Sequence, residues 1–276
     1  MRIARFEDAS GTGVGAVTGE ELRRLPWRRL EDLFAEPDPA AAVRAVDTRR
    51  LAPVGEHRLL APTVERCQLV ATGGNYDDHV AEAGRALAEP VFFSSLWTSI
   101  TGPGSAIVKP SAETFLDYEV EFAVVIGKRA TKLTPETALD AVFGYTVTND
   151  ISARDVMAGT KLQIVLSKSL DTFWPVGPHL VTADEVPDPG RLGVTSALNG
   201  EPRQSGNTSR LIWDVPALLS KLTASITLHP GDIVTTGTPG GVGYHRTPPE
   251  SMKPGDVITA AVEGVGVLSN HVIAGW

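Results

Sequence analysis

The chain has 276 residues, a net charge of −8, 42% hydrophobic and 21% charged residues, so it is long enough to bury a substantial core. It has no run of Lys and Arg that could follow a phosphate backbone and no stretch of about 18 apolar residues. Nucleic acid is therefore a poor candidate partner, and we expect no membrane-spanning segment. The single cysteine, Cys67, excludes an intrachain disulfide, and the N-terminal residues lack the apolar core of a signal peptide, so we expect a cytoplasmic protein.

Residues 1–65 are expected to form a small α+β domain. Residues 2–7 alternate in polarity and lead into a Gly-rich segment, which predicts a β-hairpin. Residues 20–34 predict a helix, which the Pro-Asp-Pro run at 37–39 ends, and residues 40–46 predict a further helical turn. Pro53 and Pro62 bracket a linker to the rest of the chain.

Residues 66–276 are expected to form a second, mostly β domain. Short apolar or alternating runs separated by Gly, Pro and Asp turns cover residues 68–72, 91–93, 118–126, 145–148, 179–182, 232–236 and 256–262. Helices are predicted only at 75–87, 134–141 and 212–222. The pattern favours a curled, mostly antiparallel sheet over repeated strand–helix–strand units, so the predicted fold class is α+β, mostly β.

Two carboxylates alternate with apolar side chains in the run at 118–126. Val120 and Phe122 lie on one face of the predicted strand, whereas Glu119 and Glu121 lie on the other and are followed there by Ala123. Carboxylates at positions i and i+2 are about 7 Å apart at the backbone, and they repel unless a cation or a proton relieves them. A solvated strand face is the commoner explanation of this spacing, but the apolar continuation of the same face favours an interior position.

Asp150 follows the run at 145–148, where a strand is expected to end. Such an Asp is usually a turn or capping residue, but its position also suits a third oxygen ligand. Arg154, four residues on, could face the same cavity and bind a carboxylate through two nitrogens. Three carboxylates suit Mg²⁺, Mn²⁺ or Ca²⁺ better than zinc, so Glu119, Glu121 and Asp150 are the candidate metal ligands.

His79 and Glu82 are three residues apart on the helix predicted at 75–87, so their side chains can pair. A carboxylate that orients an imidazole raises its basicity, which makes a general base for water. A lone His near a helix start is more often structural, whereas the preceding Gly73 and Gly74 would permit a mobile flap.

Together these segments resemble the fumarylacetoacetate hydrolase family. The matching motifs are Gly74-Asn75-Tyr76 with His79 and Glu82, Asp117-Tyr118-Glu119-x-Glu121, and Asn149-Asp150-x-Ser152-Ala153-Arg154-Asp155. Further matches lie at 168–178, 198–201, 206–208 and 230–243, in the order of the family across residues 67–275.

The resemblance implies a mixed β-roll catalytic domain, a homodimer, and Mg²⁺ or Mn²⁺ on Glu119, Glu121 and Asp150, with Ca²⁺ as a substitute in crystals. It implies that His79 and Glu82 form a water-activating pair on a flap. By the same resemblance, a catalytic cation is expected at Lys168, and substrate contacts at Tyr76, Arg154, Gly237 and Thr238.

Two positions depart from the family pattern. Ser95 stands where members commonly carry Lys, and Met157 stands where Gln is usual. A missing ammonium and a missing amide remove polar contacts from near the pocket. We therefore expect a substrate that is larger or less polar than a fumarylacetoacetate-like diacid.

The leading functional prediction is divalent-metal-dependent C–C hydrolysis of an acylpyruvate or a related β-diketo or 2-keto acid. The acid would chelate the metal, His79 would activate water, and Lys168 with the metal would stabilise the resulting enolate. A decarboxylase, isomerase or hydratase stays open, because these reactions pass through the same enolate. A catalytically altered biosynthetic member stays open as well, and it predicts that replacing His79 leaves function unchanged.

Overall fold

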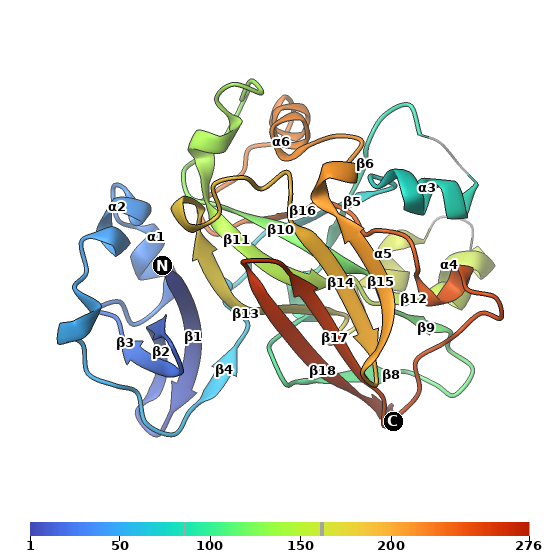
Figure 1. Ribbon diagram of the computed structural model, residues 1–276, viewed down its shortest axis with the longest axis horizontal. Coiled ribbons are helices and arrows are strands. Elements are labelled where there is room, and N and C mark those ends of the chain that lie inside the picture. The colour runs from blue at the N-terminus through green and yellow to red at the C-terminus, as the bar shows by residue number, and fades with distance from the viewer. Residues whose placement is uncertain (85–86, 161–162, 276) are drawn as a thin grey trace.

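A computed structural model describes residues 1–84, 87–160 and 163–275, without the side chains of 158–160 (Figure 1). Two sheets form its frame. The large one has the order β3 (Glu21–Arg24), β2 (Gly11–Thr18), β1 (Arg2–Asp8), β13 (Trp174–Thr182), β11 (Val142–Asn149), β10 (Val120–Ile126), β16 (Ile233–Thr235), β5 (Leu69–Gly73) and β6 (Val91–Ser95). Strands β4 (Arg58–Leu60) and β7 (Ile100–Thr101) join it beside β1 and β13.

The smaller sheet has five strands and packs on the middle of the large one. Its order is β15 (Glu201–Asn207), β14 (Gly193–Leu198), β17 (Val257–Val262), β18 (Gly266–Ala274) and β8 (Ala106–Lys109). Strands β14 and β17 contact β10, and the side chains between the sheets include Phe122, Val124 and Val262. A separate pair, β9 (Leu116–Asp117) with β12 (Ser152–Ala153), lies near the site described below. The prediction of a mostly β, α+β fold is confirmed.

The helices are short and lie around the sheets (Figure 1). They are α1 (Leu30–Phe34), α2 (Pro39–Arg44), α3 (Asp77–Ala83), α4 (Arg154–Thr160), α5 (Ile164–Lys168) and α6 (Val215–Thr223). Single 3₁₀ turns cover Thr48–Arg50, Trp97–Ser99, Ala138–Ala141, Ala183–Glu185, Thr208–Arg210 and Gly243–His245. Within the described part of the chain, none of these helices has the length and apolarity needed to cross a membrane.

The predicted N-terminal hairpin is confirmed as β1 and β2. The helix predicted at 20–34 is wrong over its first half, where β3 adds to this hairpin and buries Leu22 against Ala4 and Phe6. Pro26 lies between the strand and α1, and it cannot donate the backbone hydrogen bond that a continuous helix would need. Strand β1 also pairs with β13, so the N-terminal segment extends the large sheet, and the boundary near residue 65 stays a prediction.

The other predicted helices exist in shorter form. The prediction at 75–87 corresponds to α3, which Gly84 ends in a left-handed conformation, and residues 85 and 86 lie outside the described chain. The prediction at 134–141 is reduced to the 3₁₀ turn Ala138–Ala141. Helix α6 begins later than predicted, because the Asp214 carboxylate caps it by accepting a hydrogen bond from the Ala217 N–H at 2.9 Å.

Candidate metal and keto-acid site

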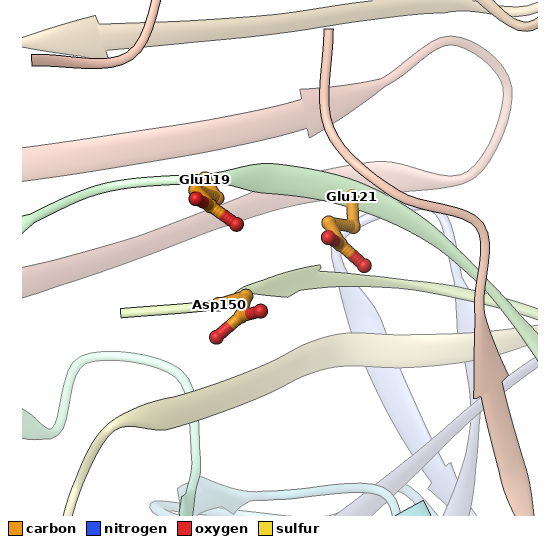
Figure 2. A group of neighbouring side chains, drawn as sticks. All are labelled: Glu119, Glu121 and Asp150. Carbon is orange, nitrogen blue, oxygen red and sulfur yellow. The ribbon is translucent and has the colours of Figure 1, made fainter. Parts of the chain in front are cut away.

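The three candidate metal ligands converge from two neighbouring strands (Figure 2). Antiparallel β10 and β11 pair Val120 with Asn149, which brings the start of one strand beside the end of the other. The Asp150 N–H donates a hydrogen bond of 2.8 Å to the Glu119 carbonyl. One carboxylate oxygen from each of Glu119, Glu121 and Asp150 lies within 4.8 Å of the other two, and all three side chains are buried.

The buried triad carries carboxylate oxygens that the protein does not satisfy. Oε2 of Glu121 and Oδ1 of Asp150 are buried and accept no hydrogen bond from the described residues. Burial, with the nearby charges of Asp150 and Glu119, raises the pKa of Glu121 well above its usual value. Burial also raises the pKa of Asp150 to about 7, although Lys168 opposes this. Unpaired carboxylate oxygens of this kind fit a hard divalent cation.

Two cations lie against the triad. Nζ of Lys168 is 2.9 Å from Oε2 of Glu119 and 2.5 Å from Oδ2 of Asp150. Burial lowers the pKa of the Lys168 ammonium, but these two carboxylates outweigh burial and raise it. For Glu119, burial acts to raise the pKa, whereas Lys168 and Arg154 lower it to about 2. Lys168 and Glu119 are therefore held as an ion pair.

Arg154 joins the triad to a fourth buried carboxylate. Its Nε donates to Oδ2 of Asp117 at 2.9 Å, and its Nη2 contacts Oε1 of Glu119. Arg154 lines the cavity, and its guanidinium bridges two carboxylates of the protein. Its contact with a substrate carboxylate stays a prediction. The carboxylates of Asp117, Glu119, Glu121 and Asp150 outnumber the cations Arg154 and Lys168 by four to two. When all four carboxylates are ionised, the excess of two negative charges matches one divalent cation.

Asp117 anchors the glycine-rich turn on the other side of the site. Oδ1 of Asp117 accepts the Gly243 N–H at 2.7 Å, and Oδ2 accepts the Tyr244 N–H at 3.1 Å. Sequence analysis included Asp117 in a motif but missed this structural role. One carboxylate thus fixes both the Arg154 guanidinium and the turn that carries His245.

A cavity of about 370 Å³ opens directly onto the triad. Its polar lining comprises Thr72, His79, Glu119, Glu121, Asp150, Arg154, Lys168, Thr238 and His245. His245, which lies two residues after the motif ending at Gly243, was not among the residues predicted from the sequence. The His245 ring stands edge-on to that of His79, with 6.1 Å between their centroids.

The predicted pair of His79 and Glu82 forms on α3. Nδ1 of His79 lies 2.8 Å from Oε1 of Glu82, and Oε2 of Glu82 accepts the Gly241 N–H at 2.9 Å. Burial acts to raise the pKa of Glu82, but these hydrogen bonds lower it overall, so the carboxylate stays ionised. An ionised partner favours the proton on Nδ1 and leaves Nε2 of His79, a residue of the cavity lining, free to accept a proton.

The predicted substrate contacts differ in position. Thr238 lines the cavity, and its hydroxyl accepts a hydrogen bond from Nε2 of Gln204 at 2.7 Å. Tyr76 is wholly buried and lies outside the cavity lining, as does Gly237. Gly237 has a φ of +89°, and a Cβ there would lie 3.1 Å from that of Asn75. The assignment of Tyr76 and Gly237 to substrate binding stays a prediction, while the structure gives Gly237 a backbone role.

The two departures from the family pattern lie in different surroundings. Met157 lines the cavity. Ser95 is buried outside the lining, where its hydroxyl donates to the Lys168 carbonyl at 3.1 Å. Of these two positions, only Met157 faces the space that a substrate could occupy.

Known proteins match this chain over most of its length. The model for the C-terminal domain of fumarylacetoacetate (FAA) hydrolase matches residues 68–273. The mitochondrial oxaloacetate tautomerase FAHD2A of Bos taurus is 41% identical over 269 residues, covering 96% of this chain and 86% of that protein. The oxaloacetate tautomerase YisK of Bacillus subtilis is 43% identical over 225 residues, covering 79% of this chain and 74% of that one.

A solved structure shares the whole architecture. It is the 5-carboxymethyl-2-hydroxymuconate delta-isomerase of Mycobacterium smegmatis, which is 32% identical, covers all of both chains and has a TM-score of 0.81. The match to the domain model, the identity to these enzymes and the shared fold agree with the motifs around the buried triad. The chain is therefore a member of the fumarylacetoacetate hydrolase family.

Proposed function

We propose that this chain is a divalent-metal-dependent enzyme that interconverts the keto and enol forms of a small 2-keto acid. The observation that carries the proposal is the buried triad of Glu119, Glu121 and Asp150, which has unsatisfied oxygens beside a cavity and Lys168 at its edge. The names of the similar tautomerases and of the similar isomerase support the same class of reaction.

The triad would hold Mg²⁺ or Mn²⁺, since both accept carboxylate oxygens. Bound there, the cation would supply Lewis acidity that makes the hydrogens on C3 of the keto acid more acidic. The remaining chemistry belongs to side chains of the chain itself.

His79 is the proposed base. Its Nε2 takes a proton from C3, the electron pair of that C–H bond forms the C2–C3 double bond, and the carbonyl oxygen becomes an enolate oxygen. The Lys168 ammonium stabilises this negative charge, and return of the proton to oxygen completes the enol. Glu82 keeps His79 oriented, and Asp117 keeps Arg154 in place at the wall of the site.

The test is hydrogen exchange at C3. With Mg²⁺ in D₂O, the chain should accelerate loss of the C3 proton signal of a 2-keto acid, measured by proton NMR, and chelation should abolish the acceleration. Exchange no faster than with Mg²⁺ alone, over a panel of 2-keto acids, would overturn the proposal.

C–C hydrolysis of an acylpyruvate is the second candidate. The geometry that favours it is the pairing of His79 with Glu82, because the same base can take a proton from water instead of carbon. Release of pyruvate from an acylpyruvate, detected by chromatography, would support hydrolysis. Hydrogen exchange at C3 without cleavage would support tautomerisation. CO₂ release would select decarboxylation. The homodimer implied by the family stays a prediction, which light scattering would test by measuring the molar mass in solution.

A further inference from the structure

The lining of the cavity holds two groups of side chains, which we call its polar end and its apolar end. The triad, Arg154 and Lys168 lie against one another and form the polar end. The apolar end comes from α3, the segment that follows it, β6 and the α4–α5 region, and it consists of Val80, Ala83, Leu87, Val91, Phe93, Met157 and Ile164. Helix α3 lies above α4 and α5 at the same end of the molecule in Figure 1. These helices therefore flank the cavity.

A glycine makes room for part of this apolar wall. Gly74 has a φ of +64°, and a Cβ at this position would lie 2.6 Å from Cδ1 of Leu87. The absence of a side chain at Gly74 thus lets Leu87 pack close to the start of α3 while it lines the cavity. Phe93 marks where the two ends meet, because Nζ of Lys168 lies 5.4 Å from the centre of its ring.

The strong cations of the described lining are already engaged. The Arg154 guanidinium contacts Asp117 and Glu119, and the Lys168 ammonium contacts Glu119 and Asp150. A second carboxylate at the far end of a substrate would meet apolar side chains there. Desolvating an anion without a partner is strongly unfavourable, whereas burying an alkyl group is favourable.

We propose that the apolar end is a subsite for the tail of the keto acid, so that the chain prefers a 2-keto acid with an alkyl or acyl tail to a dicarboxylic one. The inference rests on the proposed function only for the keto-acid head at the triad. The cavity has a volume of about 370 Å³, within the usual range of ligand pockets, roughly 300–1,000 Å³. This volume is larger than a four-carbon acid needs.

The experiment measures binding, independently of turnover. Calorimetry with Mg²⁺ would compare pyruvate, 2-oxobutanoate, 2-oxopentanoate and 2-oxohexanoate. It would also compare 2-oxoglutarate with 5-methyl-2-oxohexanoate, in which an isopropyl group replaces the second carboxylate at similar shape. Affinity should rise about fourfold for each added methylene, and the isopropyl compound should bind at least about tenfold more tightly than 2-oxoglutarate.

Three variants locate the subsite. Leu87→Ser should reduce the gain in binding affinity for each added methylene. Met157→Lys should shift the binding preference toward 2-oxoglutarate. Leu96→Ser is the matched control, because Leu96 is an exposed leucine just after β6 that does not line the cavity. It should leave both properties unchanged.

The subsite is overturned by a flat chain-length series, by tighter binding of 2-oxoglutarate to the unmodified chain, or by a preference that Leu87→Ser and Met157→Lys both leave unchanged. Its failure is distinguishable from failure of the proposed function. A rising series without C3 exchange would remove the tautomerase and keep the subsite, and exchange with a flat series would do the reverse.

Discussion

Nζ of Lys168 lies 2.9 Å from Oε2 of Glu119, with both side chains almost completely buried. Removing one partner of such a pair leaves the other charge uncompensated in the interior. We therefore expect Lys168→Met to lower the free energy of unfolding of the metal-free protein by about 3–5 kcal/mol, measured by urea denaturation. Mg²⁺ should recover part of this loss, because it compensates the same carboxylates.

Lys221→Met is the matched control for this substitution. Lys221 pairs with Glu89 at the surface, where both side chains are exposed to solvent. Exposed pairs contribute about 0–1 kcal/mol, so this variant should be nearly as stable as the unmodified chain. Equal stability of the two variants without metal would contradict the importance of the buried pair.

Metal binding can be tested at Glu121. Mg²⁺ at a concentration of 100 Kd should stabilise the unmodified protein by about 2.7 kcal/mol, and Glu121→Gln should abolish most of this gain. Thermal unfolding with Mg²⁺ and with chelator measures both values. Glu136→Gln, at an exposed glutamate, should keep the full gain. An unchanged gain in Glu121→Gln would exclude the triad as the Mg²⁺ site.

Glu121→Gln should also change how the free energy of unfolding of the metal-free protein depends on pH. The folded-state pKa of Glu121 is raised above its unfolded value, chiefly by burial and then by Asp150. Its contribution to stability is therefore present below the unfolded pKa and is lost as the pH rises toward the folded pKa. Glu121→Gln should consequently be more stable than the unmodified chain at pH 8 and should lose this advantage at pH 4, as measured by denaturation with chelator present.

Catalysis should depend on His79. His79→Ala is expected to slow C3 exchange by about 10²–10⁴-fold, because it removes the base, while stabilisation by Mg²⁺ stays unchanged. His271→Ala, at an exposed histidine on β18, is the control and should keep full activity. Full activity of His79→Ala would support the catalytically altered alternative. A parallel loss of Mg²⁺ stabilisation would point to a structural role for His79.

Stability toward acid should depend on His179, which lies on β13. Burial lowers its folded-state pKa, although its Nε2 lies 2.8 Å from the Val265 carbonyl. The folded state therefore resists protonation, so this stability is present above the unfolded pKa, about 6.5, and is lost as the pH falls below it.

Replacing His179 should weaken the dependence of the unfolding free energy on pH in this acidic range. The slope of unfolding free energy against pH between about 5 and 6.5 should be smaller in His179→Gln, by at most about 1.4 kcal/mol per pH unit. His57→Gln, at an exposed histidine, should keep the slope. Identical slopes for His179→Gln and the unmodified chain would show that His179 does not titrate differently on folding.

Local sequence patterns predicted the elements whose side chains repeat regularly. The period-two alternation at 118–126 identified β10 and put Glu119 and Glu121 on one face, and the spacing of His79 and Glu82 predicted their pairing. Strands β14, β15 and β18 went unpredicted. Strand β15 is mostly polar, and β14 and β18 mix polar and small residues with apolar ones. Besides their hairpin partners, β14 pairs with β17 and β18 pairs with β8, which lie elsewhere in the chain.

By itself, the sequence determined the family and singled out Glu119, Glu121, Asp150 and His79 as candidates, because these residues lie in short motifs whose chemistry can be read locally. Only the tertiary structure decided what surrounds them. It pairs Asp117 with Arg154 and buries Ser95 outside the cavity lining. It also places Met157, Leu87 and His245 together in that lining. These contacts join residues far apart in the chain, so they depend on how the sheets and helices pack, which no local pattern specifies.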